Sequence, residues 1–197
     1  MTMTRQYPDP WLDRWLDLLK SRAGAKPVLE IGCGFGDDTA VLDGAGLSVI
    51  GFDLSAEAVA VTRARVPAAR IGQQDVRDPL PAGSVQLGAI VASLSLHYFS
   101  WKDTIGIVER IRHALRPGGI LLCRLNSTQD THFGADSAEL IEPGYFLVQG
   151  EAKRFFDEAA VARLFGEGWN VLGREHRTTD KYHLPKSVWE IVVERVS

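Results

Sequence analysis

A short apolar run that ends in a glycine-rich turn is the feature that most constrains the fold of this chain. Residues 27–31, Pro-Val-Leu-Glu-Ile, precede Gly-Cys-Gly-Phe-Gly at 32–36, and a helical pattern begins at Asp37. Glycines at such a turn allow a tight backbone and let a ligand approach where a Cβ would block it. The run therefore predicts a buried strand, a turn at the edge of a sheet and a helix that follows it.

The same alternation of strand-like runs and helical patterns continues along the chain. Further apolar runs lie at 47–52, 68–72, 85–91 and 120–125, and helical patterns separate most of them, at 37–42, 55–65 and 100–115. This order predicts right-handed crossovers and a parallel sheet covered on both faces. Two late runs, 169–175 and 188–194, predict an antiparallel hairpin at one edge. We therefore expect an α/β fold with a doubly wound, seven-stranded, mostly parallel sheet of the Rossmann-like type.

Two segments depart from this alternation within the single domain that we expect for residues 1–197. The N-terminal segment, 1–25, contains a helical pattern in which Asp9 can act as the cap. This helix either packs on the flank of the domain or covers a ligand, with three aromatic side chains forming part of the cover: Tyr7, Trp11 and Trp15. The segment 126–156 lacks clear periodicity and is long for a connection, which predicts a lid over an acceptor site.

Composition places the chain among ordinary globular proteins. It has 197 residues, 45% of them hydrophobic and 24% charged, and a formal net charge of −3. No apolar run approaches the roughly 18–20 residues that cross a bilayer, and Met1–Tyr7 lacks the features of a secretory signal. The two cysteines, Cys33 and Cys123, lie in apolar contexts that suit a reducing compartment. We expect a cytoplasmic protein that binds neither membranes nor nucleic acid.

The residues after the glycine turn distinguish between two kinds of ligand. A dinucleotide-binding turn has Gly-x-Gly-x-x-Gly, and its third glycine would fall at position 37, where this chain has Asp37 followed by Asp38. Two carboxylates at the start of a helix repel a pyrophosphate and tolerate a cationic ligand. The turn therefore favours a ligand without phosphate that carries positive charge.

The pattern Glu-x-Gly-x-Gly-x-Gly after a strand resembles the signature of class I S-adenosylmethionine-dependent methyltransferases, and the resemblance runs in order from Val28 to Asn126. It implies S-adenosylmethionine as cofactor and S-adenosylhomocysteine as product. It further implies that Asp53, at the end of the second strand, holds the ribose hydroxyls. The turn residues that would contact the cofactor are Glu30, Gly32, Cys33, Gly34 and Gly36.

The resemblance implies further cofactor contacts after the second, third and fourth strands. Leu54, Asp75 and Val76 would hold the adenine, with Asp75 accepting a hydrogen bond from its amine. Ala92, Ser93 and Leu94 would meet the methionine moiety through their backbone, and Trp11 would cover the site.

Methyl transfer from a sulfonium is an in-line displacement, so the protein supplies alignment and desolvation, and a base only where the acceptor is protonated. His97 is the candidate base, and its alternative role is local packing with one hydrogen bond. Tyr98, Arg124 and Asn126 are candidate substrate residues because they follow the fourth and fifth strands at the same edge. Arg124 could instead pair with an acid of the long loop.

Several observations bear on the acceptor. Neither Asn-Pro-Pro-Tyr nor Pro-Cys, which would indicate methylation of nucleic-acid bases, occurs in the chain. We therefore expect a small-molecule acceptor, a monomer or homodimer, and no metal, because the remaining histidines lack ligand spacing. The stretches 93–99, 153–156 and 189–191 resemble a subset of bacterial small-molecule methyltransferases that includes the tellurite-resistance type. Two alternatives stay open: a catalytically inactive S-adenosylmethionine-binding module, and an NAD-dependent oxidoreductase, which Asp37 disfavours.

Overall fold

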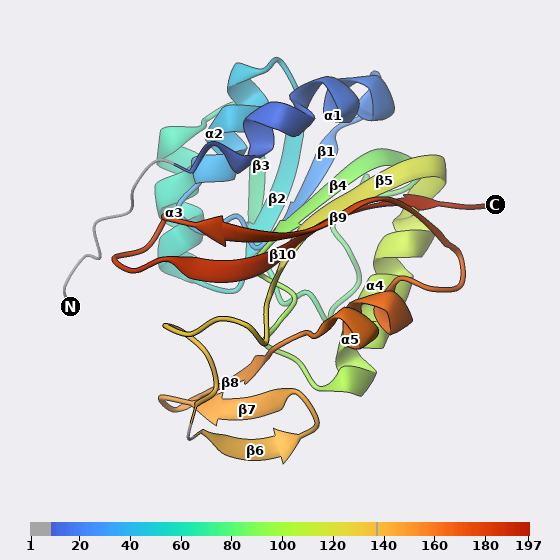
Figure 1. The fold of residues 1–197 in the computed structure, drawn as a ribbon. Coiled ribbons are helices and arrows are strands. Elements are labelled where there is room, and N and C mark those ends of the chain that lie inside the picture. The colour runs from blue at the N-terminus through green and yellow to red at the C-terminus, as the bar shows by residue number, and fades with distance from the viewer. Residues whose placement is uncertain (1–8, 137) are drawn as a thin grey trace.

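The computed structural model describes residues 9–136 and 138–197 and contains the expected seven-stranded sheet (Figure 1). The strand order is β3-β2-β1-β4-β5-β10-β9, with β1 to β5 parallel and β10 antiparallel to both of its neighbours. The bounds are β1 (Val28–Ile31), β2 (Val49–Asp53), β3 (Arg70–Gln73), β4 (Leu87–Ser93), β5 (Leu115–Asn126), β9 (Trp169–Thr179) and β10 (Lys186–Arg195). The prediction of a doubly wound sheet with an antiparallel C-terminal hairpin is confirmed.

Helices cover both faces of the sheet because the strands carry apolar side chains on both sides. One face lies under α1 (Leu16–Ala23), α2 (Asp37–Gly44) and α3 (Ala56–Arg65), and the other under α4 (Trp101–Ala114) and α5 (Glu158–Leu164). Leu19 and Leu42 pack with strand residues on the first face, and Ile107 and Val161 do so on the second. No helix of the described ranges is long and apolar enough to cross a membrane.

The N-terminal segment begins as a 3-10 helix, η1 (Pro10–Trp15), and continues as α1. Asp9 occupies the N-cap position, as predicted, but its side chain makes no capping hydrogen bond. The carboxylate instead pairs with Arg124 of β5. A buried guanidinium is the stronger partner for this carboxylate. The predicted role of Tyr7 falls outside the described residues.

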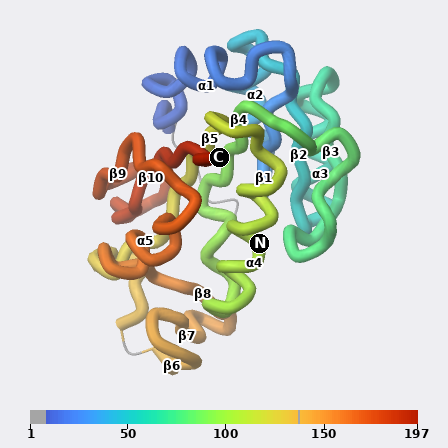
Figure 2. The backbone as a smooth tube through the Cα atoms, turned by 90° about the vertical axis from the view of Figure 1, so that its right-hand side faces the viewer, coloured from blue at the N-terminus to red at the C-terminus, as the bar shows by residue number. Residues whose placement is uncertain are grey.

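The segment after β5 contains regular structure that the sequence analysis did not predict. Three four-residue strands, β6 (Glu139–Glu142), β7 (Tyr145–Val148) and β8 (Glu151–Arg154), form a separate antiparallel sheet at the far end of the molecule from α1 and α2 (Figure 2). Gln149 and Gly150 both have positive φ, as a two-residue hairpin turn requires. The strands are short and mostly half-exposed, so they leave no clear alternation in the sequence.

Candidate cofactor and acceptor site

The glycine turn after β1 has the geometry of a ligand cradle. Gly32 and Gly34 have φ of 75° and 52°, which L side chains rarely adopt. A Cβ on Gly32 would lie 2.4 Å from the Cβ of Ser95, so the backbone passes too close to the β4 loop for any larger residue. A Cβ on Gly34 would meet nothing within 4 Å. The turn is therefore packed on one side and open on the other, at the carboxyl end of the sheet where ligands bind in such folds.

Asp53 ends β2 beside this turn and is held by two backbone amides. The N–H of Gly34 donates to its Oδ2 and the N–H of Ser55 to its Oδ1, both at 2.9 Å. These bonds fix the carboxylate and leave acceptor capacity on each oxygen, because an ionised carboxylate offers about four lone-pair sites. This arrangement suits a ligand with two adjacent hydroxyls, such as a ribose.

The residues predicted to hold an adenine lie at the ends of β2 and β3, next to Asp53. The side chain of Leu54 is 66% exposed, whereas Val76 is buried. The Asp75 carboxylate accepts hydrogen bonds from the Arg77 guanidinium and backbone N–H, and these bonds lower its pKa. The exposed Leu54 side chain is therefore free to cover an adenine ring. The amine of that adenine would donate to the same Asp75 carboxylate that already accepts from Arg77.

Two buried acids lie behind the turn. Glu30 accepts a hydrogen bond from the Thr39 hydroxyl at 2.5 Å, and Asp38 accepts one from the Trp11 indole at 2.9 Å. Burial and the nearby Asp38 carboxylate raise the pKa of Glu30 to about 8. Burial likewise raises the pKa of Asp38. Trp11 is itself 7% exposed and fastens η1 to the start of α2, while its predicted contact with the cofactor stays a prediction.

Cys33 is a buried thiol within the turn. It packs against Val59 and Ile71, and burial raises its pKa to about 12. A protonated thiol at neutral pH is a poor nucleophile, so Cys33 acts here as a small residue that fits a crowded backbone.

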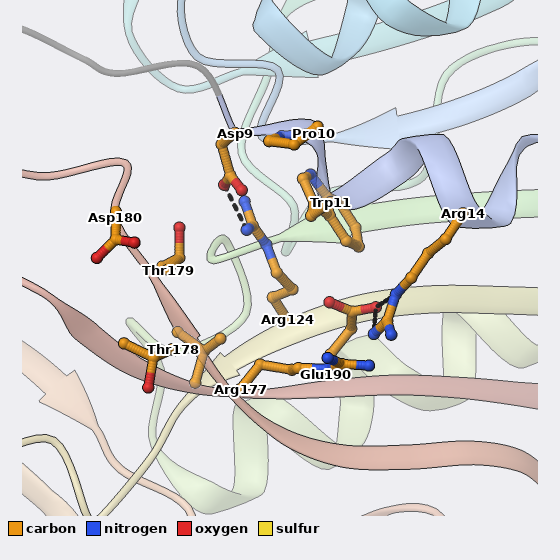
Figure 3. A pocket seen from close by; sticks show the side chains of 11 residues that line it. Asp9, Pro10, Trp11, Arg14, Arg124, Arg177, Thr178, Thr179, Asp180 and Glu190 are labelled. Atoms are coloured by element: carbon orange, nitrogen blue, oxygen red, sulfur yellow. Dashed lines mark hydrogen bonds and ion pairs between the residues drawn. The ribbon is translucent and has the colours of Figure 1, made fainter.

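Arg124 is buried at the end of β5 and lies in a network that joins it to the N-terminal segment (Figure 3). Its guanidinium donates to Asp9 at 2.5 Å and to the Ser93 hydroxyl at 2.8 and 3.0 Å, and it lies 4.3 Å from the centre of the Trp11 ring. The predicted alternative of an acid from the long loop is wrong, because the partner is Asp9. A contact between Arg124 and an acceptor stays a prediction.

A cavity of about 310 Å³ opens beside this network, between η1 and the β9–β10 hairpin. Arg14 and Arg177 reach it from either side, and both are paired with Glu175. Arg14 also pairs with Glu190. The guanidinium groups of Arg14 and Arg177 are therefore already paired with carboxylates of the protein.

The segment predicted to meet the methionine moiety comprises the last two residues of β4, Ala92 and Ser93, and the residue after it, Leu94. Ala92 is buried in the core, and Ser93 accepts from Arg124. Leu94 has φ of 54°, and its N–H donates to the Arg124 carbonyl at 3.0 Å. The amide of Leu94 is therefore already used within the protein.

The other acceptor-side candidates differ in exposure. His97 is 4% exposed and Asn126 1%, while Tyr98 is 45% exposed and its ring lies 4.1 Å from that of His97. Within the described residues, Nδ1 of His97 and both amide atoms of Asn126 have no hydrogen-bond partner. Burial and the positive charges of Lys186 and Lys153 lower the pKa of His97 well below its usual value. His97 is therefore neutral at pH 7, as a general base must be.

Three charged residues near the site were not identified from the sequence. Lys181, in the β9–β10 connection, lies 3.6 Å from Asp37 at the start of α2, so the hairpin tip reaches across the carboxyl edge of the sheet. Lys186 and Asp130 form an ion pair at 3.7 Å. The only sequence signal for Lys186 is a lysine before a strand, which is too common a pattern to identify a site.

The seven-stranded sheet, the glycine turn and the carboxylate at the end of β2 define a Rossmann-like fold with a nucleoside-binding edge. Residues 28–119 match the family described as "Methyltransferase domain". Residues 28–119 therefore form a methyltransferase domain of the class I S-adenosylmethionine-dependent type, for which S-adenosylmethionine is the cofactor.

Individual relatives agree with this assignment. A putative methyltransferase of Bacillus subtilis is 28% identical over 185 residues, which cover 80% of this chain and 73% of the relative. A trans-aconitate 2-methyltransferase of Azoarcus sp. is 34% identical over 151 residues, 74% of this chain and 54% of the relative. The chain spans about half the length of most of the curated relatives it matches.

Solved structures agree at the level of the fold. An S-adenosylmethionine-dependent methyltransferase from Methanosarcina mazei superposes with a TM-score of 0.77 at 18% identity, covering 91% of this chain and 97% of the other. TehB from Haemophilus influenzae superposes with a TM-score of 0.67 at 13% identity, covering 91% of this chain and 61% of the other. The narrower tellurite-resistance resemblance stays a prediction, and the oxidoreductase and inactive-module alternatives gain no support.

Proposed function

We propose that this protein transfers the methyl group of S-adenosylmethionine to a small-molecule acceptor by in-line displacement. The observation that carries the proposal is the Asp53 carboxylate, which Gly34 and Ser55 orient beside a turn that is open on one side. The sulfonium supplies the reactive methyl group. The chain binds and orients the two reactants and excludes water between them.

The way the carboxyl edge is covered supports a small acceptor. The β9–β10 connection reaches the start of α2 through Lys181 and Asp37, and the N-terminal segment reaches β5 through Asp9 and Arg124. A site bounded from two sides in this manner suits a small molecule better than a polymer. The names of two relatives, trans-aconitate 2-methyltransferases, agree with this class of acceptor, as does the net charge of −3. We propose that the N-terminal segment and residues 126–156 cover the acceptor site.

Replacing Asp53 with alanine is expected to weaken the binding of S-adenosylhomocysteine by about ten-fold or more. The substitution removes a charged acceptor whose hydrogen bonds are worth roughly 1.5–3 kcal/mol. It also takes the acceptor from Gly34 N–H and Ser55 N–H, so we expect a stability loss of about 1 kcal/mol. Calorimetric titration and thermal unfolding measure the two effects separately. Asp78→Ala, at an exposed position after β3, is the matched control; equal affinity in both variants would mean that the ribose is held elsewhere.

Turnover is tested by release of S-adenosylhomocysteine in the presence of small thiols, amines, phenols and carboxylic acids. We expect acceptor-dependent release with at least one class, and its absence from the Asp53→Ala variant at low cofactor concentration. Tight binding of S-adenosylhomocysteine without release for any class would contradict the proposed transfer.

A further inference from the structure

Four buried polar residues lie at the start of β10 and at, or a few residues beyond, the ends of β4 and β5. Lys186 is 9% exposed, Asp130 and His97 4% and Asn126 1%. Lys186 is close enough to His97 for its charge to lower the pKa of the imidazole. Asn126 pairs with Val188 in the β5–β10 ladder, two residues from Lys186 and on the same face. We refer to these four residues as the Lys186 cluster.

The hydrogen bonds of the Lys186 cluster are incomplete. Within the described residues, His97 Nδ1, Asn126 Nδ2 and Oδ1, and Asp130 Oδ2 have no hydrogen-bond partner. Buried polar atoms in folded proteins are nearly always paired, because an unpaired one loses its bonds to water without replacement. So many unpaired atoms in one place point to a polar ligand that completes them.

The ion pair within the Lys186 cluster is also incomplete. Asp130 Oδ1 accepts from the N–H groups of His132 and Phe133, which fixes the carboxylate. Its Oδ2 lies 3.7 Å from Lys186 Nζ, too far for a hydrogen bond. A buried pair is stable only when hydrogen bonds satisfy both groups. The ammonium therefore retains donors for another acceptor. Burial, together with the charge of Lys153, lowers the pKa of Lys186 despite the opposing attraction of Asp130.

The charge around the Lys186 cluster favours an anion. The two charged groups that act on His97 are both cations, Lys186 and Lys153. Lys153 pairs with Glu151 at the surface, while the acid nearest to Lys186 is Asp130. The centres of the Phe133 and Tyr182 rings lie 5.2 and 5.7 Å from Lys186 Nζ, so aromatic carbon borders the ammonium. A small anion with a carbon skeleton matches both features.

We propose that the methyl acceptor is a small organic acid whose carboxylate is held by Lys186, with the Asn126 amide as a second donor. This inference rests on the proposed function and specifies its substrate class. Lys186 is the specificity-determining residue, because its ammonium is the buried cation of the cluster. Phe133 and Tyr182 exclude water from the acid's carbon skeleton.

The test uses the full chain saturated with S-adenosylhomocysteine. Calorimetry compares succinate, citrate and benzoate with the uncharged succinamide and benzamide and with the cation butylamine. We expect at least one acid to bind saturably and each matched amide to bind about ten-fold or more weakly. Lys186→Met should weaken acid binding about ten-fold or more while changing the affinity for S-adenosylhomocysteine less than two-fold. Lys102→Met, the same change at an exposed position of α4, should alter neither affinity.

Two further variants guard against loss of the fold. Lys186→Met leaves Asp130 buried without a counter-ion. The double variant Lys186→Met/Asp130→Asn removes both charges, so acid binding can be measured without an unpaired carboxylate. Lys186→Arg keeps the positive charge and should restore part of the acid affinity. Equal binding of acids and amides, preferential binding of butylamine, or no saturable binding of any acid overturns the proposal. Failure of S-adenosylhomocysteine to bind the unaltered protein would instead overturn the proposed function.

Discussion

Replacing Arg124 with methionine is expected to lower the free energy of unfolding by about 3 kcal/mol. Arg124 is 1% exposed and bonds to Asp9 and Ser93, so its removal leaves a largely buried carboxylate without its partner. Breaking a buried pair from one side costs roughly 3–5 kcal/mol, and we take the lower end because Asp9 retains some contact with water. For a chain of this length the melting temperature should fall by roughly 6–12 °C.

Two further variants test the Arg124 prediction. Arg65→Met removes the same side chain from an exposed pair with Asp37 and should cost less than about 1 kcal/mol. Combining Arg124→Met with Asp9→Asn should cost less than the sum of the two single changes, because no unpaired charge remains. If Arg124→Met leaves stability intact and abolishes acceptor binding, Arg124 is a substrate residue after all.

Replacing Glu30 with glutamine is expected to stabilise the protein increasingly as the pH rises. In the folded chain Glu30 stays protonated up to about pH 8, whereas in the unfolded chain it ionises near its ordinary value of 4.5. Raising the pH between these values therefore favours the unfolded state. Glutamine keeps an oxygen for the Thr39 hydroxyl and never ionises, so this cost disappears.

The Glu30 effect is measured as the difference in unfolding free energy between Glu30→Gln and the unaltered protein. The difference should grow by roughly 2–3 kcal/mol between pH 5 and pH 7 and level off above about pH 8. Using a difference cancels the opposite contribution of His97, whose lowered pKa makes folding more favourable as the pH rises towards 6.5. Glu57→Gln, at an exposed position of α3, should give a flat difference. A flat profile for Glu30→Gln would show that this carboxyl ionises normally in the folded state.

The role of Asp9 and the strands β6 to β8 could not be predicted from the sequence for a common physical reason. Asp9 has the residue type and position of a helix cap, yet its carboxylate turns to Arg124, 115 residues away. The strands β6 to β8 have four residues each and stand apart from the main sheet. The periodicity of apolar residues does not show whether a carboxylate pairs with a local or a distant group. A short, half-exposed strand is likewise too brief to produce such a periodicity.

The sequence by itself determined which segments form strands and helices, their order along the chain, and the position of the glycine turn. Apolar periodicity records which face of each segment is buried, and right-handed crossovers then leave few ways to connect the strands. It also placed Asp53 beside the turn, because the turn follows β1 and Asp53 ends the neighbouring parallel strand β2.

Only the tertiary structure decided how the buried charges are paired. Glu30 lies near Asp38, Arg124 pairs with Asp9, and Lys186 faces Asp130, and none of these relations is visible in the local pattern around the residues. The identity of a charged residue in the sequence does not show whether its side chain is solvated or buried. Its protonation, its contribution to stability and its availability to a ligand depend on partners that long-range packing brings within a few ångströms.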